Sequence, residues 1–329
     1  MVAKPDRREK FVASVVAFLR KHALDGASLD WEYPNWNPKI EGETEQEAER
    51  GNFNALLKEM REAFDDRWTL SASVSAGPKK IDTAYDVPKM SEYLDWINVM
   101  AYAWWTQSNK AKKMVEGAMK DVTVTGHFSA MEKPKGDENY MGNSERIVPY
   151  SIKYWIDKGM PRDKINLGTA TYGKSFRLAN KKNNTLNAVT DGTAERAPLL
   201  NGNGYFAYFE ICDWNWDKHG KVSYQKSKVK APYASKDNLW VAYESPESIA
   251  YKVKQIVNKF VYNGEESQGV GGISFWALDL DDFNNYCSTN GYLGHYPLIR
   301  SAVEALTRDC NDEDARSRGL KGGNCEWSV

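Results

Sequence analysis

The chain has 329 residues, of which 41% are hydrophobic and 27% charged, and its formal net charge is -1. This length allows one large domain or two ordinary ones, and the composition is that of a globular protein. The near-zero charge argues against nucleic acid as a partner, and no apolar stretch approaches the roughly 20 residues that cross a membrane.

Helical and strand patterns alternate along the chain. Apolar residues recur at helical spacing over residues 6–22, and a short strand is predicted over 26–32. A charged amphipathic helix is predicted over 44–65. Four more strands are predicted from alternating or apolar runs that end at turn residues, at 68–75, 96–102, 165–171 and 271–278.

Helix start and stop signals mark the remaining elements. A helix over 144–159 ends at Gly159 with Pro161 beyond it, and Ser245 followed by Pro246 caps another. A last helix is predicted over 297–306. Strands separated by helices imply a parallel sheet with crossover connections.

One segment breaks this alternation and suggests the domain boundaries. Residues 175–243 show no clear helix, and short aromatic runs alternate there with Asn, Gly and Lys turns, which predicts a small α+β insertion. We therefore expect a main domain of residues 1–174 and 244–308. The charged, Gly-rich residues 309–329 have no core pattern and are predicted to form a C-terminal tail.

The aromatic content and the cysteines allow several readings. Twelve Trp and eighteen Tyr fit either an aromatic core or flat surfaces on which sugar rings stack. Four cysteines, in the last third of the chain, allow three pairings that the spacing does not distinguish. Without a Cys-x-x-Cys motif a zinc site is disfavoured, so we expect disulfides and an oxidising compartment. The polar residues 1–10 contain no signal-peptide core, which on its own indicates a cytoplasmic protein.

The segment over residues 24–34 carries the clearest chemistry. Side chains two apart on a strand share a face, so Ser28, Asp30 and Glu32 are predicted to point the same way. Two neighbouring carboxylates repel, and one of them should keep its proton to a higher pH, as a general acid requires. The alternative is a pair of ordinary surface acids at a strand end, because Asp-x-Glu alone is common.

The flanking residues favour the catalytic reading. Residues 25–34, Asp-Gly-Ala-Ser-Leu-Asp-Trp-Glu-Tyr-Pro, resemble the Asp-x-x-Asp-x-Asp-x-Glu signature of glycoside hydrolase family 18, the chitinases and chitinase-like lectins. Further resemblance follows in order at residues 71–88, 97–102, 124–127, 171–176, 272–283 and 296–299. It spans nearly all of residues 6–306 and implies a TIM-type (β/α)8 barrel.

The resemblance implies a substrate-assisted mechanism, for which family 18 is known. Glu32 matches the general acid that protonates the glycosidic oxygen, and the nucleophile is the substrate's own 2-acetamido oxygen. Asp30 matches the carboxylate that orients the acetamido group and stabilises developing positive charge. The substrate class is therefore β-1,4-linked N-acetylglucosamine polymers, with no metal or cofactor.

The resemblance also implies a set of substrate-binding residues at the ends of the barrel strands. Tyr102 and Tyr172 match tyrosines that hold the acetamido group, and Trp276 matches the floor on which a sugar stacks. The remaining candidates are Ser28, Met100 and Lys174. Core packing is the alternative for each aromatic residue alone, but the carboxyl end of a barrel strand favours binding.

Three positions depart from the family pattern. Ser28 stands where the family has the middle Asp of the signature, and Ala103 stands where its Met-x-Tyr-Asp motif ends. Lys174 stands at the family's Arg position, which keeps the charge but loses the planar fork. Loss of one transition-state contact at Ala103 predicts a rate reduction of about 10²–10³.

The resemblance begins at the family's third helix. Only strands four to eight have counterparts, and an eight-stranded barrel does not close from five strands. We therefore expect an N-terminally truncated barrel, either a fragment or a degraded relative. Cys212 and Cys287 match a family disulfide, which leaves Cys310 and Cys325 for each other and favours an extracellular protein.

The sequence thus predicts a monomeric hydrolase of chitin or chitooligosaccharides, with Glu32 as acid and base and Asp30 as assistant. A non-hydrolytic chitin-binding lectin is the main alternative, favoured by Ser28 and Ala103. A protein that keeps only the scaffold is a third, and the surviving aromatic residues argue against it.

Overall fold

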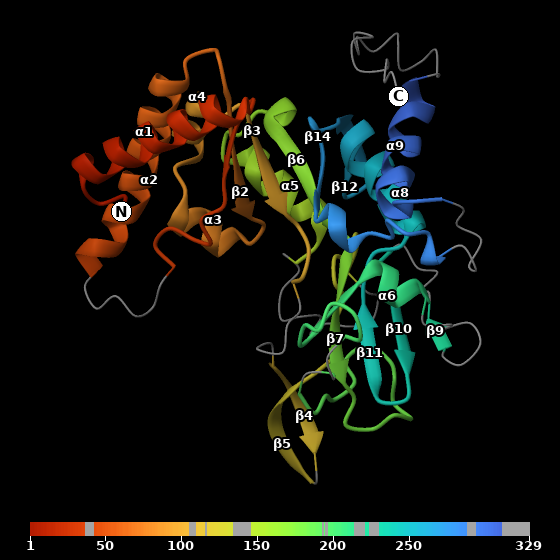
Figure 1. Ribbon diagram of the computed structural model, residues 1–329. Helices are drawn as coiled ribbons and strands as arrows, with labels where there is room; N and C mark the ends of the chain where they lie inside the picture. Colours follow the sequence, from red (N-terminus) through yellow and green to blue (C-terminus); the bar gives the residue numbers. More distant parts are fainter. Residues whose placement is uncertain are drawn as a thin grey trace. The chain divides into compact units, whose positions relative to one another are not determined.

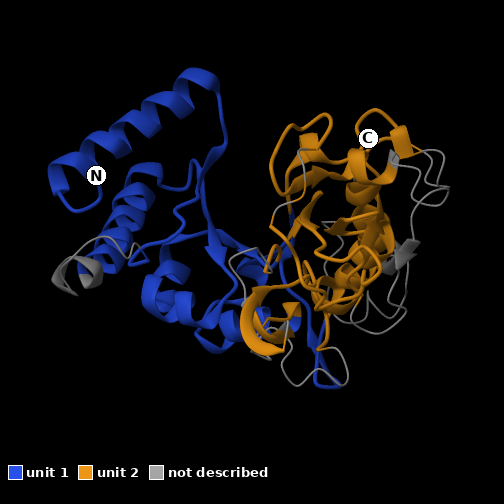
Figure 2. Cartoon of the chain, turned by 90° about the horizontal axis from the view of Figure 1, so that it is seen from below, with its two compact units in different colours: residues 1–101, 149–168, 260–274 blue, residues 102–148, 169–259, 275–329 orange. Residues whose placement is uncertain are grey.

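The computed structural model describes residues 1–36, 43–104, 110–115, 117–133, 146–192, 194, 197–213, 221–223, 230–287 and 294–310. The protein is a mixed α/β structure that divides into two compact units, coloured separately in Figure 2. Unit 1 comprises residues 1–101, 149–168 and 260–274, and unit 2 comprises residues 102–148, 169–259 and 275–329.

Unit 1 is built around a five-stranded sheet in the order β1-β2-β3-β6-β14 (Figure 1). Its strands are Gly26–Leu29, Thr69–Ser75, Trp96–Met100, Ile165–Ala170 and Gly272–Trp276. The first four pair in parallel along this order. These are the five strands that the sequence predicted, which confirms a parallel sheet with crossover connections.

Three helices lie where the sequence predicted them: α1 Pro5–His22, α2 Glu43–Phe64 and α5 Val148–Asp157. Helices α3 Pro78–Ala84 and α4 Val87–Tyr93 were not predicted. In α2 the buried side chains of Leu57, Met60 and Phe64 recur at helical spacing and form the apolar face that covers the sheet. Of the helix predicted over 144–159, residues 144 and 145 lie outside the described residues.

Close backbone approach within the sheet depends on glycine. A Cβ atom at Gly168 of β6 would lie 2.3 Å from the carbonyl oxygen of Val99 in β3. No side chain fits at that distance, so this position is restricted to glycine.

Unit 2 contains a second five-stranded sheet, in the order β8-β7-β11-β10-β9. The strands are Tyr205–Ala207, Tyr172–Arg177, Leu239–Ala242, Tyr233–Lys236 and Lys221–Ser223. Neighbours in this order pair antiparallel. An antiparallel hairpin of β4 (Lys110–Val115) and β5 (Ala118–Thr123) also belongs to this unit.

Residues 175–243, where the sequence pattern shows no clear helix, contain one. Helix α6 spans Tyr208–Asp213. The buried carboxylate of Glu210 accepts hydrogen bonds from the backbone N–H groups of Ala207 (2.9 Å) and Leu199 (2.6 Å). A helix of six residues is too short for a periodic pattern, and it forms here because tertiary hydrogen bonds hold it.

Two helices complete unit 2. Ser245 caps α8 (Pro246–Lys252) through a capping box with Ser248, as the sequence predicted. Helix α9 spans Pro297–Cys310 and extends beyond the predicted end at residue 306. Within the described residues, no helix has both the length and the apolar character needed to cross a bilayer.

Candidate active site

The two candidate carboxylates lie directly after strand β1. The strand predicted over 26–32 ends at Leu29, so Asp30 and Glu32 lie in the loop at its carboxyl end. Both side chains are exposed, whereas Trp31 turns the other way and packs edge-on against Phe53 of α2 at 5.8 Å between ring centroids. The alternation that the sequence predicted therefore continues past the end of the strand.

Contacts from two helices hold this loop. The backbone N–H of Asn35 donates to the carboxylate of Glu49 in α2 at 2.7 Å. Its side-chain amide donates to the carbonyl oxygen of Thr83 in α3 at 2.9 Å. Asn35 itself has φ 57°, a left-handed conformation that Asn tolerates better than most residues. These long-range contacts therefore turn the chain at Asn35, six residues after the end of the strand.

The negative charge of Glu32 affects Asp30 and two neighbouring phenols. Partial burial, and then the negative charge of Glu32, raise the pKa of Asp30 above its ordinary value. Burial, and then the charge of Glu32, raise the pKa of Tyr33. Burial raises the pKa of Tyr85 as well, with smaller contributions from both carboxylates.

Ser28 and Met100 belong to the strands of the same unit. Ser28 lies on β1 opposite Ser71 of β2, with an exposed side chain. Met100 is the last residue of β3, opposite Ser75 of β2, and is half-buried.

Unit 2 holds the predicted aromatic residues, and its ring contacts bring two of them together. Tyr102 and Tyr172 meet edge-on with ring centroids 6.2 Å apart. Phe128 contacts both, stacked on Tyr102 at 6.4 Å and edge-on to Tyr172 at 5.4 Å. Tyr205 of β8 extends the group, with its ring 5.7 Å from that of Tyr172. Such offset and edge-on pairs are the favoured aromatic geometries.

Lys174 and Trp276 are the other two candidate residues in unit 2. The Lys174 ammonium lies 3.5 Å from the centroid of the Tyr205 ring, a close cation–π contact. The side chain of Trp276 is 57% exposed. An exposed tryptophan of this kind is free to stack on a ligand.

Ala103 carries an unusual backbone for its residue type. Its φ is 53°, in the left-handed region, and its side chain packs against the buried cluster that includes Phe128. Asp and Asn enter that region more readily than Ala. The backbone at Ala103 is therefore one that an aspartate accepts.

Sequence reasoning missed four residues that these contacts single out: Tyr33, Tyr85, Phe128 and Tyr205. Tyr33 adjoins Glu32 in the sequence, so its proximity was a usable signal. The others are placed by folding and carried no signal of their own.

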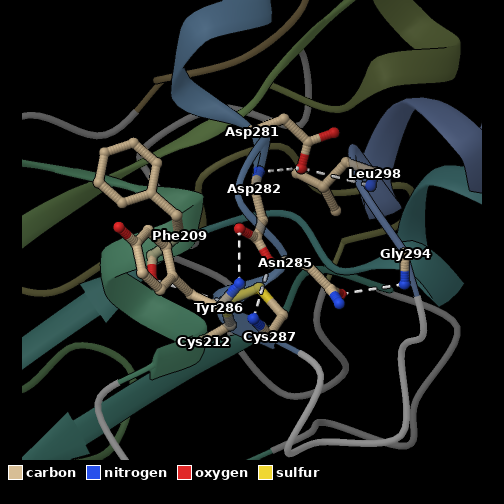
Figure 3. Close-up of a disulfide and its surroundings, with 9 residues drawn as sticks. All are labelled: Phe209, Cys212, Asp281, Asp282, Asn285, Tyr286, Cys287, Gly294 and Leu298. Atoms are coloured by element: carbon tan, nitrogen blue, oxygen red, sulfur yellow. Dashed lines mark hydrogen bonds between the residues drawn. A yellow bond between two sulfur atoms is a disulfide. The ribbon is translucent and has the colours of Figure 1, made fainter.

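A disulfide joins Cys212 of α6 to Cys287, as the resemblance implied (Figure 3). The carboxylate of Asp282 accepts hydrogen bonds from the backbone N–H of Cys287 at 2.7 Å and of Tyr286 at 2.9 Å. Ligand atoms of Cys212, Asp282 and Cys287 lie within 4.8 Å of one another, but the bonded sulfurs offer no thiolate to a metal. The Cys310 side chain and Cys325 lie outside the described residues.

Comparison with known proteins decides the family. The protein-family model described as "Glycosyl hydrolases family 18" matches residues 1–281 of this chain. The chain belongs to glycosyl hydrolase family 18. It is 32% identical to Chitotriosidase-1 of Mus musculus over 315 residues, which is 93% of this chain and 59% of that protein. The chain therefore spans less than two thirds of this relative.

Solved family-18 structures include both chitinases and a protein without activity. The Ostrinia furnacalis Group II chitinase catalytic domain 2 matches with TM-score 0.77 and 32% identity, over 93% of this chain and 72% of that one. Human YKL-39, described as a pseudo-chitinase with retained chitooligosaccharide binding, matches with TM-score 0.73 and 32% identity, over 93% and 75% of the two chains. These relatives imply a TIM-type barrel architecture. They support chitin hydrolysis as an activity of the family.

Proposed function

We propose that this chain hydrolyses β-1,4-linked N-acetylglucosamine polymers by a substrate-assisted, retaining mechanism. The observation that carries the proposal is the position of Asp30 and Glu32, which are both exposed and follow the carboxyl end of β1, where the charge of Glu32 raises the pKa of Asp30. A general acid needs such surroundings, because neighbouring charges and hydrogen bonds set the pH at which it donates.

The proposed first step breaks the glycosidic bond. Protonated Glu32 donates its proton to the glycosidic oxygen while the carbonyl oxygen of the substrate's 2-acetamido group attacks the anomeric carbon. An oxazolinium ring forms and the shortened chain leaves as an alcohol. Asp30 orients the acetamido N–H and stabilises the positive charge that develops on the ring.

The proposed second step opens the oxazolinium ring. The Glu32 carboxylate removes a proton from a water molecule, which attacks the anomeric carbon from the side of the departed sugar. Two inversions give net retention, and Glu32 is again protonated for the next cycle. One acidic side chain thus serves both steps, because the second nucleophile belongs to the substrate.

We assign sugar binding to the remaining candidates. Tyr102 and Tyr172 hold the acetamido group and Trp276 stacks on a pyranose ring, which their aromatic character and the exposure of Trp276 support. Ser28, Met100 and Lys174 are proposed to complete the substrate contacts. Ser28, Ala103 and Lys174 attenuate the activity relative to the family pattern.

We also propose a domain organisation, a cellular location and a set of partners. We propose a barrel domain of residues 1–174 and 244–308, an α+β insertion at 175–243 and a C-terminal tail at 309–329. The Cys212–Cys287 disulfide supports an extracellular protein, since such bonds persist in oxidising compartments. We propose that it acts as a monomer on chitin or chitooligosaccharides, without nucleic acid or membrane partners.

A chitin-binding lectin is the second candidate, and Ala103 is the observation that favours it. The similarity to YKL-39 supports the same alternative. Chitohexaose turnover, followed by chromatography of the products, separates the two. A chitinase gives shorter oligomers that disappear in Glu32→Gln, whereas binding of chitohexaose by calorimetry without any product supports the lectin.

A further inference from the structure

We propose that Asn183 is a site of N-linked glycosylation. Asn183-Asn184-Thr185 is the one Asn-x-Ser/Thr sequence in the 329 residues, and its middle residue is not proline. It lies in unit 2, in the segment between β7 and β8. The proposal rests on the extracellular location proposed above, because this modification takes place on the secretory route, and it is independent of hydrolysis.

The acceptor asparagine lies in an exposed turn. Residues 179–183 are all exposed. The backbone N–H of Asn183 donates to the carbonyl oxygen of Asn180 at 2.9 Å, and the backbone N–H of Lys182 donates to the Asn180 side-chain oxygen at 3.0 Å. Neither bond uses the side-chain nitrogen of Asn183, which is the atom that a glycan takes. A bulky, hydrated group attached there therefore meets solvent rather than packed side chains.

The hydroxyl group of Thr185 lies next to the acceptor side chain. It donates to the side-chain oxygen of Asn183 at 3.0 Å, with the carbonyl oxygen of Leu186 as an alternative acceptor at 3.2 Å. The bond to Asn183 spans two residues, so it depends only on the local chain and not on the rest of the fold. The two side chains that define the acceptor sequence therefore contact each other directly.

The middle residue of the sequence has a different role, because Asn184 is tied to the antiparallel sheet of unit 2. Its side-chain amide donates to the hydroxyl of Ser235 in β10 at 2.9 Å. Its carbonyl oxygen accepts a hydrogen bond from the indole N–H of Trp240 in β11 at 3.2 Å. Both partners are buried. Of the two adjacent asparagines, the half-buried Asn184 thus holds the turn to the sheet, and the exposed Asn183 is the one that the sequence pattern selects as acceptor.

The transfer needs a co-substrate that carries an activated sugar. The proposed donor is an oligosaccharide linked to a polyprenyl diphosphate, and an oligosaccharyltransferase of the secretory route catalyses the step. The side-chain nitrogen of Asn183 forms a bond to the anomeric carbon of the first N-acetylglucosamine, while the bond from that carbon to the diphosphate oxygen breaks. The diphosphate leaves with the electron pair, and the amide nitrogen gives up one proton.

Four variants separate the modification from a structural effect. Asn183→Gln and Thr185→Ala should carry no glycan, whereas Thr185→Ser should keep it. Asn184→Ala retains an acceptor sequence but loses the contact with Ser235, so it should carry the glycan and, as purified protein, have a lower melting temperature than the unmodified chain. A glycan that persists in Asn183→Gln would lie elsewhere in the chain and would overturn the proposal.

The experiment translates the full chain behind a cleavable signal peptide in the presence of microsomal membranes, so that entry into the lumen is supplied. Protease protection selects the chains that have entered. Most of these chains should migrate more slowly on gel electrophoresis, and peptide-N-glycosidase should abolish the shift and convert the Asn183 amide to a carboxylic acid that mass spectrometry detects. Protected chains without a glycan would overturn the proposal. Chitohexaose turnover does not enter this readout, so failure of the proposed function and failure of this proposal are distinguishable.

Discussion

The backbone N–H of Thr171 donates a 3.0 Å hydrogen bond to the carbonyl oxygen of Trp276. This bond fixes the end of β14 against the residue that precedes β7, while the Trp276 side chain stays 57% exposed. Its backbone is held and its ring is free, which is the arrangement that a stacking platform needs.

Trp276→Ala should therefore weaken carbohydrate binding without affecting the fold. We expect the affinity for chitohexaose to fall by about tenfold, the scale of one lost aromatic contact, with an unchanged melting temperature. Isothermal titration calorimetry on the Glu32→Gln background measures this. Leu278→Ala is the matched control, since Leu278 is 60% exposed and lies two residues away. Equal losses in both variants would argue against stacking.

Ala103→Asp should raise hydrolytic activity. The substitution restores the carboxylate of the family motif, and the left-handed backbone at this position accepts Asp. We expect kcat/KM for chitohexaose to increase by about 10²–10³, the scale of one regained transition-state contact. Ala103→Asn fits the same backbone without the charge and should give a much smaller gain. No gain in the aspartate variant would mean that Ala103 does not limit the rate.

Local sequence patterns were sufficient for the parallel sheet. Its five strands were predicted because apolar runs and turn residues depend only on neighbours in the chain. The end of β1 at Leu29 was not predicted, and the turn at Asn35 depends on contacts with residues 14 and 48 positions away. Helix α6 was missed because the Glu210 hydrogen bonds that support it are tertiary.

The candidate site, like the fold, could be predicted from the sequence only in part. The signature around Glu32 and the disulfide between Cys212 and Cys287 were readable from motifs, and the disulfide is confirmed. The contact between Lys174 and Tyr205 was not, because a cation–π contact leaves no spacing signal between distant residues. The catalytic and binding roles stay predictions.

Acid should destabilise the protein through His127. Burial, and then the positive charge of Lys252, lower its pKa to about 4 from 6.5. Between these values the unfolded chain binds more protons than the folded one, so stability falls as pH drops through this window. The loss should be on the order of 3 kcal/mol. Urea unfolding at several pH values measures it.

His127→Asn removes the titrating group and serves as the comparison. The free energy of unfolding of this variant should depend less on pH than that of the unmodified protein across the same window. Identical pH dependence in the two proteins would show that His127 does not contribute. Ordinary carboxylates affect both proteins alike and cancel in the difference.

Two glycines of unit 1 should respond in opposite directions to alanine. At Gly168 a Cβ atom would lie 2.3 Å from the Val99 carbonyl oxygen, so Gly168→Ala should cost about 3 kcal/mol or more. Gly51 lies in helix α2 with nothing within 4 Å of an added Cβ, so Gly51→Ala should add about 0.5–1 kcal/mol. Chemical denaturation tests both, and a neutral Gly168→Ala would contradict the tight β3–β6 pairing.

The most direct test of the central claim is time-resolved proton NMR of chitohexaose hydrolysis, which reports the anomeric form of each product as it appears. Substrate assistance with Glu32 as acid and base predicts that the β-anomer forms first and that Glu32→Gln forms no product. The α-anomer as first product, or turnover that survives Glu32→Gln, would contradict the account.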